Sequence, residues 1–165
     1  MKKILYFGGQ KSGKSALAET KTLKLSNNTK PYYIATYDNS YGDISMQNKI
    51  NTHKLQRENN FISIEQTHNL LEVIEDNQTY IIDCMSMWIL NNIEKDDEYF
   101  RNHIKDISEI TANIVFVLND VNSGIIPLEK QSRRFVDITG IVGASLVNIC
   151  DEVYEVKFTL ENKLK

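Results

Sequence analysis

Apolar residues along the chain fall into short, nearly continuous runs that are separated by longer amphipathic or polar stretches. Six of these runs are rich in β-branched and aromatic residues, which strands favour. The predicted strands are residues 3–8, 31–36, 61–66, 79–84, 113–119 and 152–158. Nearly continuous apolar runs are typical of strands that are covered on both faces, and their alternation with helical segments predicts βαβ units.

Helical periodicity marks several of the intervening segments. Residues 67–77 are predicted to form an amphipathic helix that Thr67 caps. Its expected apolar face contains Leu70, Leu71 and Ile74. The longest predicted helix covers about residues 128–149. Its expected apolar face contains Phe135, Ile138, Val142, Leu146 and Ile149.

The whole pattern predicts an α/β fold in one domain, residues 1–165, with a mainly parallel sheet and helices on both faces. Residues 153–165 have no helix signal after them and are predicted to add an antiparallel edge strand. Residues 38–60 are polar, compatible with a helix and predicted to be partly exposed, where functional elements often lie.

Charge and cysteine content limit the expected partners and the expected cellular location. The 165-residue chain has a net charge of −3 and a pI near 5.6, so neither nucleic acid nor an anionic membrane is an expected partner. No apolar run approaches the ~20 residues of a membrane span. The two cysteines, Cys84 and Cys150, lie in apolar surroundings, which argues against a disulfide framework or a zinc site. We therefore expect a cytoplasmic protein.

A glycine-rich stretch joins the first predicted strand to a predicted helix. Its sequence, GGQKSGKS at residues 8–15, matches G-x-x-x-x-G-K-[ST] at every fixed position. Glycines allow backbone N–H groups to turn toward phosphate oxygens, and a helix that begins near Lys14 adds the positive end of its dipole. Lys14 supplies charge for the outer phosphates, and the Ser15 hydroxyl is a ligand for Mg²⁺. The alternative is a chance glycine-rich turn.

A phosphate-bound Mg²⁺ usually needs a carboxylate from a neighbouring strand. Asp83 is the last but one residue of the predicted strand TYIIDC. Parallel sheets bind ligands at the carboxyl ends of their strands. Asp83 is therefore a predicted metal ligand. The alternative is a polar strand end, or a cap for the segment SMWILNN.

Seven motifs occur in a fixed order: GGQKSGKS, YIAT, THKLQR, IIDC, VLNDVNSGIIP, RRFVD and DEVYEV. Together they resemble the adenosylcobinamide kinase / adenosylcobinamide-phosphate guanylyltransferase family of cobalamin biosynthesis, over residues 4–156. The resemblance implies a P-loop domain of RecA-like type that uses Mg²⁺ with ATP and GTP. It implies phosphorylation of adenosylcobinamide by ATP or GTP, then transfer of GMP from GTP to the product through a histidine–GMP intermediate. It also implies a homotrimer.

Within this resemblance His53 is the expected nucleophile, and Lys14 is the second expected catalytic residue. Neutral imidazole is a good nucleophile at pH 7, and a covalent intermediate divides one displacement into two easier ones. If its segment is helical, Arg57 lies one turn from His53 and can stabilise charge on the α-phosphate. The alternative for His53 is an exposed position in a basic stretch. His68 and His103 match no motif and are interpreted as surface residues.

The implied nucleotide site joins the phosphate loop to the ends of three further predicted strands. Its residues are Gly8, Gly9, Gln10, Lys11, Ser12, Gly13, Lys14, Ser15, Ile34, Ala35, Thr36, Lys54, Leu55, Gln56, Arg57, Glu65 and Asp83. Carboxylates accept hydrogen bonds from the guanine edge, so Glu65 and Asp83 are candidate base readers. For Asp83 this role competes with the role of metal ligand, which the sequence leaves open.

Some positions depart from the family pattern. Asp120 and Asn122 stand where Glu and Gly are usual, and Gly143 and Ala144 replace an Asn-Gln pair. We expect these departures to affect the kinase step more than GTP binding or the histidine step. Two alternatives remain: a P-loop kinase or NTPase that acts on another small alcohol, and a degenerate nucleotide-binding paralogue with a regulatory role.

Overall fold

The computed structural model describes residues 1–27, 29–37 and 59–165. Its strands are β1 (Lys3–Gly8), β2 (Tyr32–Ala35), β3 (Ile62–Glu65), β4 (Thr79–Asp83), β5 (Asn113–Asn119), β6 (Glu152–Lys157) and β7 (Leu160–Lys163). They form one sheet in the order β3-β2-β4-β5-β1-β6-β7. Every neighbouring pair is parallel except β6 and β7, so β7 is an antiparallel edge strand, as predicted for the C-terminal segment.

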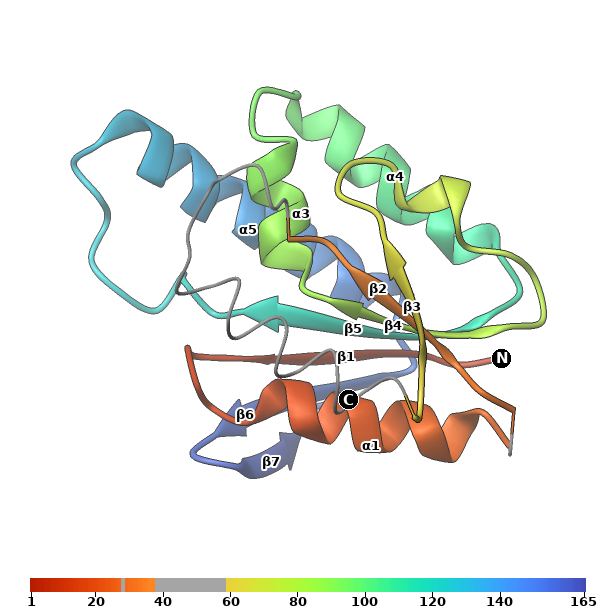
Figure 1. Ribbon diagram of the computed structural model, residues 1–165. Coiled ribbons are helices and arrows are strands. Elements are labelled where there is room, and N and C mark those ends of the chain that lie inside the picture. Colours follow the sequence, from red (N-terminus) through yellow and green to blue (C-terminus); the bar gives the residue numbers. More distant parts are fainter. Residues whose placement is uncertain (28, 38–58) are drawn as a thin grey trace.

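The helices cover both faces of this sheet (Figure 1). They are α1 (Lys14–Leu25), α3 (Met85–Asn91), α4 (Asp97–Glu109) and α5 (Lys130–Ile149). The smaller core cluster, which includes Tyr6, Tyr33 and Ala18, lies between α1 and the sheet. The larger cluster, which includes Trp88 and Phe116, lies on the other face beneath α3, α4 and α5. The predicted α/β architecture is therefore confirmed.

The predicted strands agree with the observed ones to within one residue at each end, and α5 begins two residues after the predicted start. The helix predicted at residues 67–77 is wrong, because this segment contains only a 3₁₀ turn, Leu70–Glu72, capped by Asn69. Tertiary hydrogen bonds occupy its backbone: the Trp88 indole donates to the carbonyl of His68, and the amide of Glu75 donates to the Tyr80 hydroxyl. These bonds replace those of a regular helix.

The surface position predicted for His103 is also wrong, whereas His68 is exposed as predicted. His103 lies on α4 with 5% exposure, and its ring packs against those of Trp88 and Tyr99, with centroids at 4.9 and 5.7 Å. Burial lowers the pKa of His103 to about 4, so the ring is neutral at pH 7. His103 is therefore a core residue.

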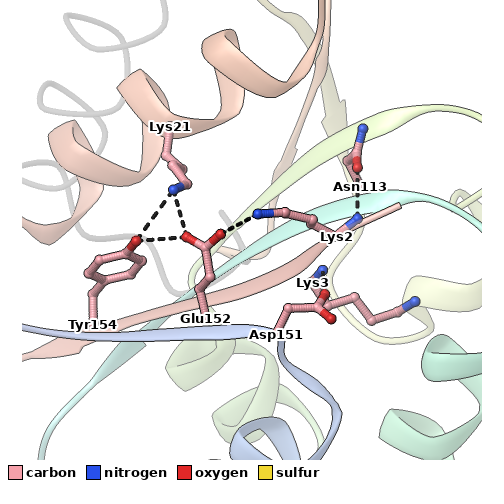
Figure 2. A network of polar contacts seen from close by, with 7 residues as sticks. All are labelled: Lys2, Lys3, Lys21, Asn113, Asp151, Glu152 and Tyr154. Carbon is pink, nitrogen blue, oxygen red and sulfur yellow. Dashed lines mark hydrogen bonds and ion pairs between the residues drawn. The ribbon is translucent and has the colours of Figure 1, made fainter. Parts of the chain in front are cut away.

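An ion-pair network lies at the N-terminal end of β1, which is the end opposite Gly8 (Figure 2). The Glu152 carboxylate accepts hydrogen bonds from Lys2 Nζ at 2.6 Å, from Lys21 Nζ at 2.7 Å and from the Tyr154 hydroxyl at 2.7 Å. Its side chain is 9% exposed. These hydrogen bonds hold the pKa of Glu152 down to about 2. The network links the start of β1, the start of β6 and helix α1.

We predict that Glu152→Gln lowers the free energy of unfolding at pH 7 by about 2 kcal/mol. Because folding depresses the Glu152 pKa from 4.5 to about 2, this contribution is present above pH 4.5 and is lost as the pH falls toward 2. The difference between wild type and variant should therefore shrink over that range. Urea unfolding at pH 7 and at pH 3 measures it.

The control is Glu94→Gln, which removes an exposed carboxylate outside the network. We expect it to change stability by less than about 0.5 kcal/mol at either pH. Equal effects of the two substitutions would show that the network does not stabilise the fold.

Candidate functional site

The glycine-rich stretch forms a loop between β1 and α1, as its sequence predicts. β1 ends at Gly8, and α1 begins at Lys14 with Gly13 as its N-cap. Gly13 has φ 95°, a left-handed conformation that glycine adopts without steric cost. We call residues 8–15 the phosphate loop, because a loop that leads from a strand into a helix N-terminus is an arrangement that favours bound anions.

Gly8 lies at a close approach between two strands. It pairs with Asn119 of β5 on one side and with Val156 of β6 on the other. A Cβ atom at Gly8 would lie 2.2 Å from the Val156 carbonyl oxygen, so no other residue fits without moving the sheet. A Cβ atom at Gly9 would meet nothing within 4 Å.

Backbone hydrogen bonds hold the phosphate loop from both sides. The amide of Asp120, which follows β5, donates to the Gly8 carbonyl at 2.9 Å. The amide of Thr159, in the turn between β6 and β7, donates to the Ser12 carbonyl at 2.7 Å. Sequence reasoning missed the contribution of Thr159, since nothing in its local sequence indicates a contact with the N-terminal loop.

Lys14 is 6% exposed, and its Nζ donates to the Gly9 carbonyl at 3.1 Å. Burial lowers the pKa of Lys14, and the nearby Cys84 and Asp83 oppose this shift. The ammonium group is therefore poorly solvated. A phosphate on the loop would find a positive charge there that water screens little.

The Ser12 hydroxyl, also in the loop, is buried and has no hydrogen-bond partner within the described part of the chain. Buried hydroxyl groups usually have a partner. A phosphate oxygen bound in the loop would give this hydroxyl an acceptor.

Asp83 ends β4, which is separated from β1 by β5. Its Oδ2 accepts a hydrogen bond from the Tyr33 hydroxyl at 2.6 Å. The alternative that Asp83 caps the next helix is not supported, because Cys84 is the N-cap of α3. Asp83 lies at the carboxyl edge of the sheet, where parallel sheets bind ligands.

Three residues lie in one register row at the carboxyl ends of β3, β2 and β4: Glu65, Ala35 and Asp83. Ala35 is in register with Glu65 on β3 and with Asp83 on β4. Neighbouring strands lie ~4.8 Å apart, so the Cα atoms of Glu65 and Asp83 are separated by about 10 Å. The row can border a ligand as wide as a purine base.

Ile34 and Thr36, which flank Ala35, are buried within the protein. The Thr36 hydroxyl donates to the Cys84 carbonyl at 2.7 Å and accepts from the Cys84 amide at 3.0 Å. Their side chains therefore support the edge of the sheet. The remaining predicted residues His53, Lys54, Leu55, Gln56 and Arg57 lie outside the described residues.

Loop and helix contacts account for two departures from the family pattern. The Asp120 carboxylate accepts hydrogen bonds from the Asn122 amide and the Ser123 hydroxyl, which fold the chain after β5. The Asn122 side chain donates to the Val136 carbonyl of α5 at 2.9 Å. Asn122 therefore ties the loop to α5. Arg134 of α5 pairs with Asp97 of α4.

Ser15 and Asp83 suit Mg²⁺ in company with phosphate. Mg²⁺ prefers oxygen ligands and commonly takes one or two from protein, with the rest from phosphates and water. Within residues 1–27, 29–37 and 59–165, no group of three or more His, Cys, Asp or Glu side chains is placed to hold a metal. A site built on the Ser15 hydroxyl, the Asp83 carboxylate and nucleotide phosphates is consistent with both facts.

The fold and the loop geometry define an α/β protein with a glycine-rich loop at the carboxyl edge of a mainly parallel sheet, and comparisons with known proteins identify its family. The family model described as cobinamide kinase / cobinamide phosphate guanyltransferase matches residues 4–164. The chain belongs to this family, and the sequence resemblance is thereby confirmed.

Two curated relatives have bifunctional names. The chain is 28% identical to the bifunctional adenosylcobalamin biosynthesis protein CobP of Pseudomonas aeruginosa, with 90% of this chain and 89% of that protein covered. It is also 28% identical to the bifunctional adenosylcobalamin biosynthesis protein CobU of Escherichia coli K12, with 98% and 99% covered.

Among solved structures, the chain is similar to the flagellar accessory protein FlaH of Methanocaldococcus jannaschii, with TM-score 0.53 and 16% identity. That match covers 99% of this chain and 78% of FlaH, and it supports the fold alone. Within the described residues, no helix has the length and apolar character to cross a membrane.

We predict that Gly8→Ala lowers the free energy of unfolding by at least about 2 kcal/mol, because the added methyl group overlaps the Val156 carbonyl. The matched control is Gly9→Ala, whose methyl group enters open space and should change stability by less than about 1 kcal/mol. Urea unfolding of both variants measures the contrast. Equal stabilities would contradict the close approach of β1 and β6 at Gly8.

Proposed function

We propose that this protein phosphorylates adenosylcobinamide with ATP or GTP and then transfers GMP from GTP to the phosphorylated product. The observation that carries the proposal is the buried Lys14 on the phosphate loop, at the same carboxyl edge of the parallel sheet as Asp83, which ends β4. Family membership over residues 4–164 supplies the substrate class.

In the kinase step, a hydroxyl oxygen of adenosylcobinamide attacks the γ-phosphorus of the donor. The new P–O bond forms as the bond to the β,γ-bridging oxygen breaks, the nucleoside diphosphate leaves and the hydroxyl proton passes to solvent. Loop amides and Lys14 stabilise the charge on the transferred group. Mg²⁺ held by Ser15 and Asp83 would supply further neutralisation of the phosphates.

In the guanylyl step, we assign His53 as the nucleophile on the resemblance of THKLQR to the family motif. An imidazole nitrogen attacks the α-phosphorus of GTP, a P–N bond forms and pyrophosphate leaves. A phosphate oxygen of adenosylcobinamide phosphate then attacks the same phosphorus, which breaks the P–N bond and gives adenosylcobinamide-GDP. The phosphate loop holds the β- and γ-phosphates, which are the leaving group in the first displacement.

The base of this GTP is assigned to the Glu65–Asp83 row. Both side chains belong to the same register row at the carboxyl edge of the sheet. Carboxylate oxygens accept hydrogen bonds from the N–H donors of a guanine edge.

The resemblance further implies a homotrimer. Light scattering should then give three times the 19.0 kDa chain mass, and a mass of one chain would refute the trimer.

We predict that incubation with Mg²⁺ and GTP labelled with ³²P at the α-phosphate transfers label to the protein. The label should be acid-labile and alkali-stable, as a phosphoramidate is, and His53→Ala should reduce it roughly a hundredfold or more. Denaturing gel electrophoresis measures the label.

The control is His68→Ala, since His68 is exposed and is not assigned to the site. It should label as the wild type does. Absence of label in a wild-type protein that binds GTP would refute the guanylyl transfer and favour a kinase for another small alcohol, or a nucleotide-binding regulator. Turnover of adenosylcobinamide with ATP separates these two.

A further inference from the structure

The turn between β6 and β7 has an unusual composition for its geometry. Lys157 pairs with Leu160, so the turn consists of two residues, Phe158 and Thr159, with φ 49° and 66°. Two-residue hairpins of this shape favour Asn-Gly, and bulky or β-branched residues at positive φ are sterically costly. Residues in such conformations are frequent at ligand sites, where the surroundings hold them.

Contacts with the phosphate loop account for Thr159 but not for Phe158. The Thr159 amide donates to the Ser12 carbonyl, and its methyl carbon would lie 3.0 Å from a Cβ at Gly13. The Phe158 side chain is 82% exposed and belongs to neither core cluster. Folding alone therefore gives no reason for an aromatic ring here.

Phe158 borders a cavity of about 680 Å³ beside the phosphate loop. Its lining consists of loop residues 8–12, the chain after β5 and the end of β6 with its turn. A cavity of this size is within the range of small-molecule sites and accommodates a nucleoside. The orphaned Ser12 hydroxyl belongs to its wall.

The cavity lies on the side of the phosphate loop opposite Asp83, and this position indicates which part of a nucleotide the cavity would bind. Asp83 is on β4, two strands from β1 on one side, whereas β6 and its turn are on the other side. Lys14 and Asp83 mark the end of the loop where γ-phosphate and Mg²⁺ bind. A nucleoside triphosphate whose γ-phosphate lies at that end of the loop extends along the loop and places its nucleoside on the β6 side.

We propose that this cavity binds the base and ribose of the nucleotide that donates phosphate, with Phe158 stacked on the base. The inference rests on the proposed kinase step and deepens it. The base used in guanylyl transfer is assigned to the opposite side, at Glu65 and Asp83. The two reactions thus use one phosphate loop with nucleotides that extend in opposite directions.

The test measures the contribution of the base directly. Calorimetry in Mg²⁺ compares two probes: an ATP analogue with nitrogen as the β,γ bridge, and inorganic tripolyphosphate, which has no base. Phe158→Ala should raise the dissociation constant of the analogue about tenfold, because base–aromatic stacking is lost. The dissociation constant of tripolyphosphate should change by less than about twofold, because the phosphate contacts remain.

Two further variants make the result specific. Phe158→Trp keeps an aromatic face and should bind the analogue as the wild type does. Leu160→Ala removes an exposed apolar side chain from the same hairpin that does not line the cavity, and it should change neither probe. Equal weakening of both probes, or no weakening of either, in Phe158→Ala would overturn the assignment.

Turnover assays separate this inference from the proposed function. In phosphorylation of adenosylcobinamide, Phe158→Ala should raise the KM for the donor about tenfold, with labelling of the protein by α-labelled GTP unchanged. A rise in the KM for adenosylcobinamide alone would assign the cavity to the acceptor and overturn the proposal. If the wild type binds the analogue as predicted but phosphorylates no adenosylcobinamide, the proposed function fails and the base site stands.

Discussion

The close packing of β1 between β5 and β6 at Gly8 is the constraint on which the site depends. Because a Cβ atom would overlap the Val156 carbonyl, the strands meet here only around glycine. The Gly8 carbonyl then accepts the amide of Asp120, and Ser12 accepts the amide of Thr159. The phosphate loop is thus fixed by both neighbouring strand ends before any ligand arrives, and such preorganisation lowers the cost of binding.

This fixed loop divides the carboxyl edge of the sheet into two sides. On one side are Asp83 and the row that leads to Glu65, and on the other is the β6–β7 turn with Phe158. Lys14 begins α1 at one end of the loop and Asp83 ends β4 on the first of these sides, which gives the loop a direction. An enzyme with two nucleotide reactions can use both sides of one phosphate site, because the phosphates are the part that both nucleotides share.

The sheet could be predicted from sequence because its strands are nearly continuous apolar runs, and the loop because its glycines and Lys14 have fixed spacing. The short 3₁₀ turn that stands in place of a helix in residues 67–77 could not, because the backbone there bonds to the side chains of Trp88 and Tyr80, which belong to later elements of the chain. His103 was misplaced although Phe100, Ile104 and Ile107 share its buried face on α4, a periodicity that does signal burial. The contact of Thr159 with Ser12 joins the two ends of the chain and has no local signal.

The central claim is that two different bonds of nucleoside triphosphates are broken on one phosphate loop. The most direct test incubates the protein with adenosylcobinamide, Mg²⁺, ATP and GTP and quantifies the products by mass spectrometry and a pyrophosphate assay. The account predicts one nucleoside diphosphate and one pyrophosphate for each adenosylcobinamide-GDP formed. Nucleoside diphosphate without pyrophosphate would contradict it, and would leave a kinase alone.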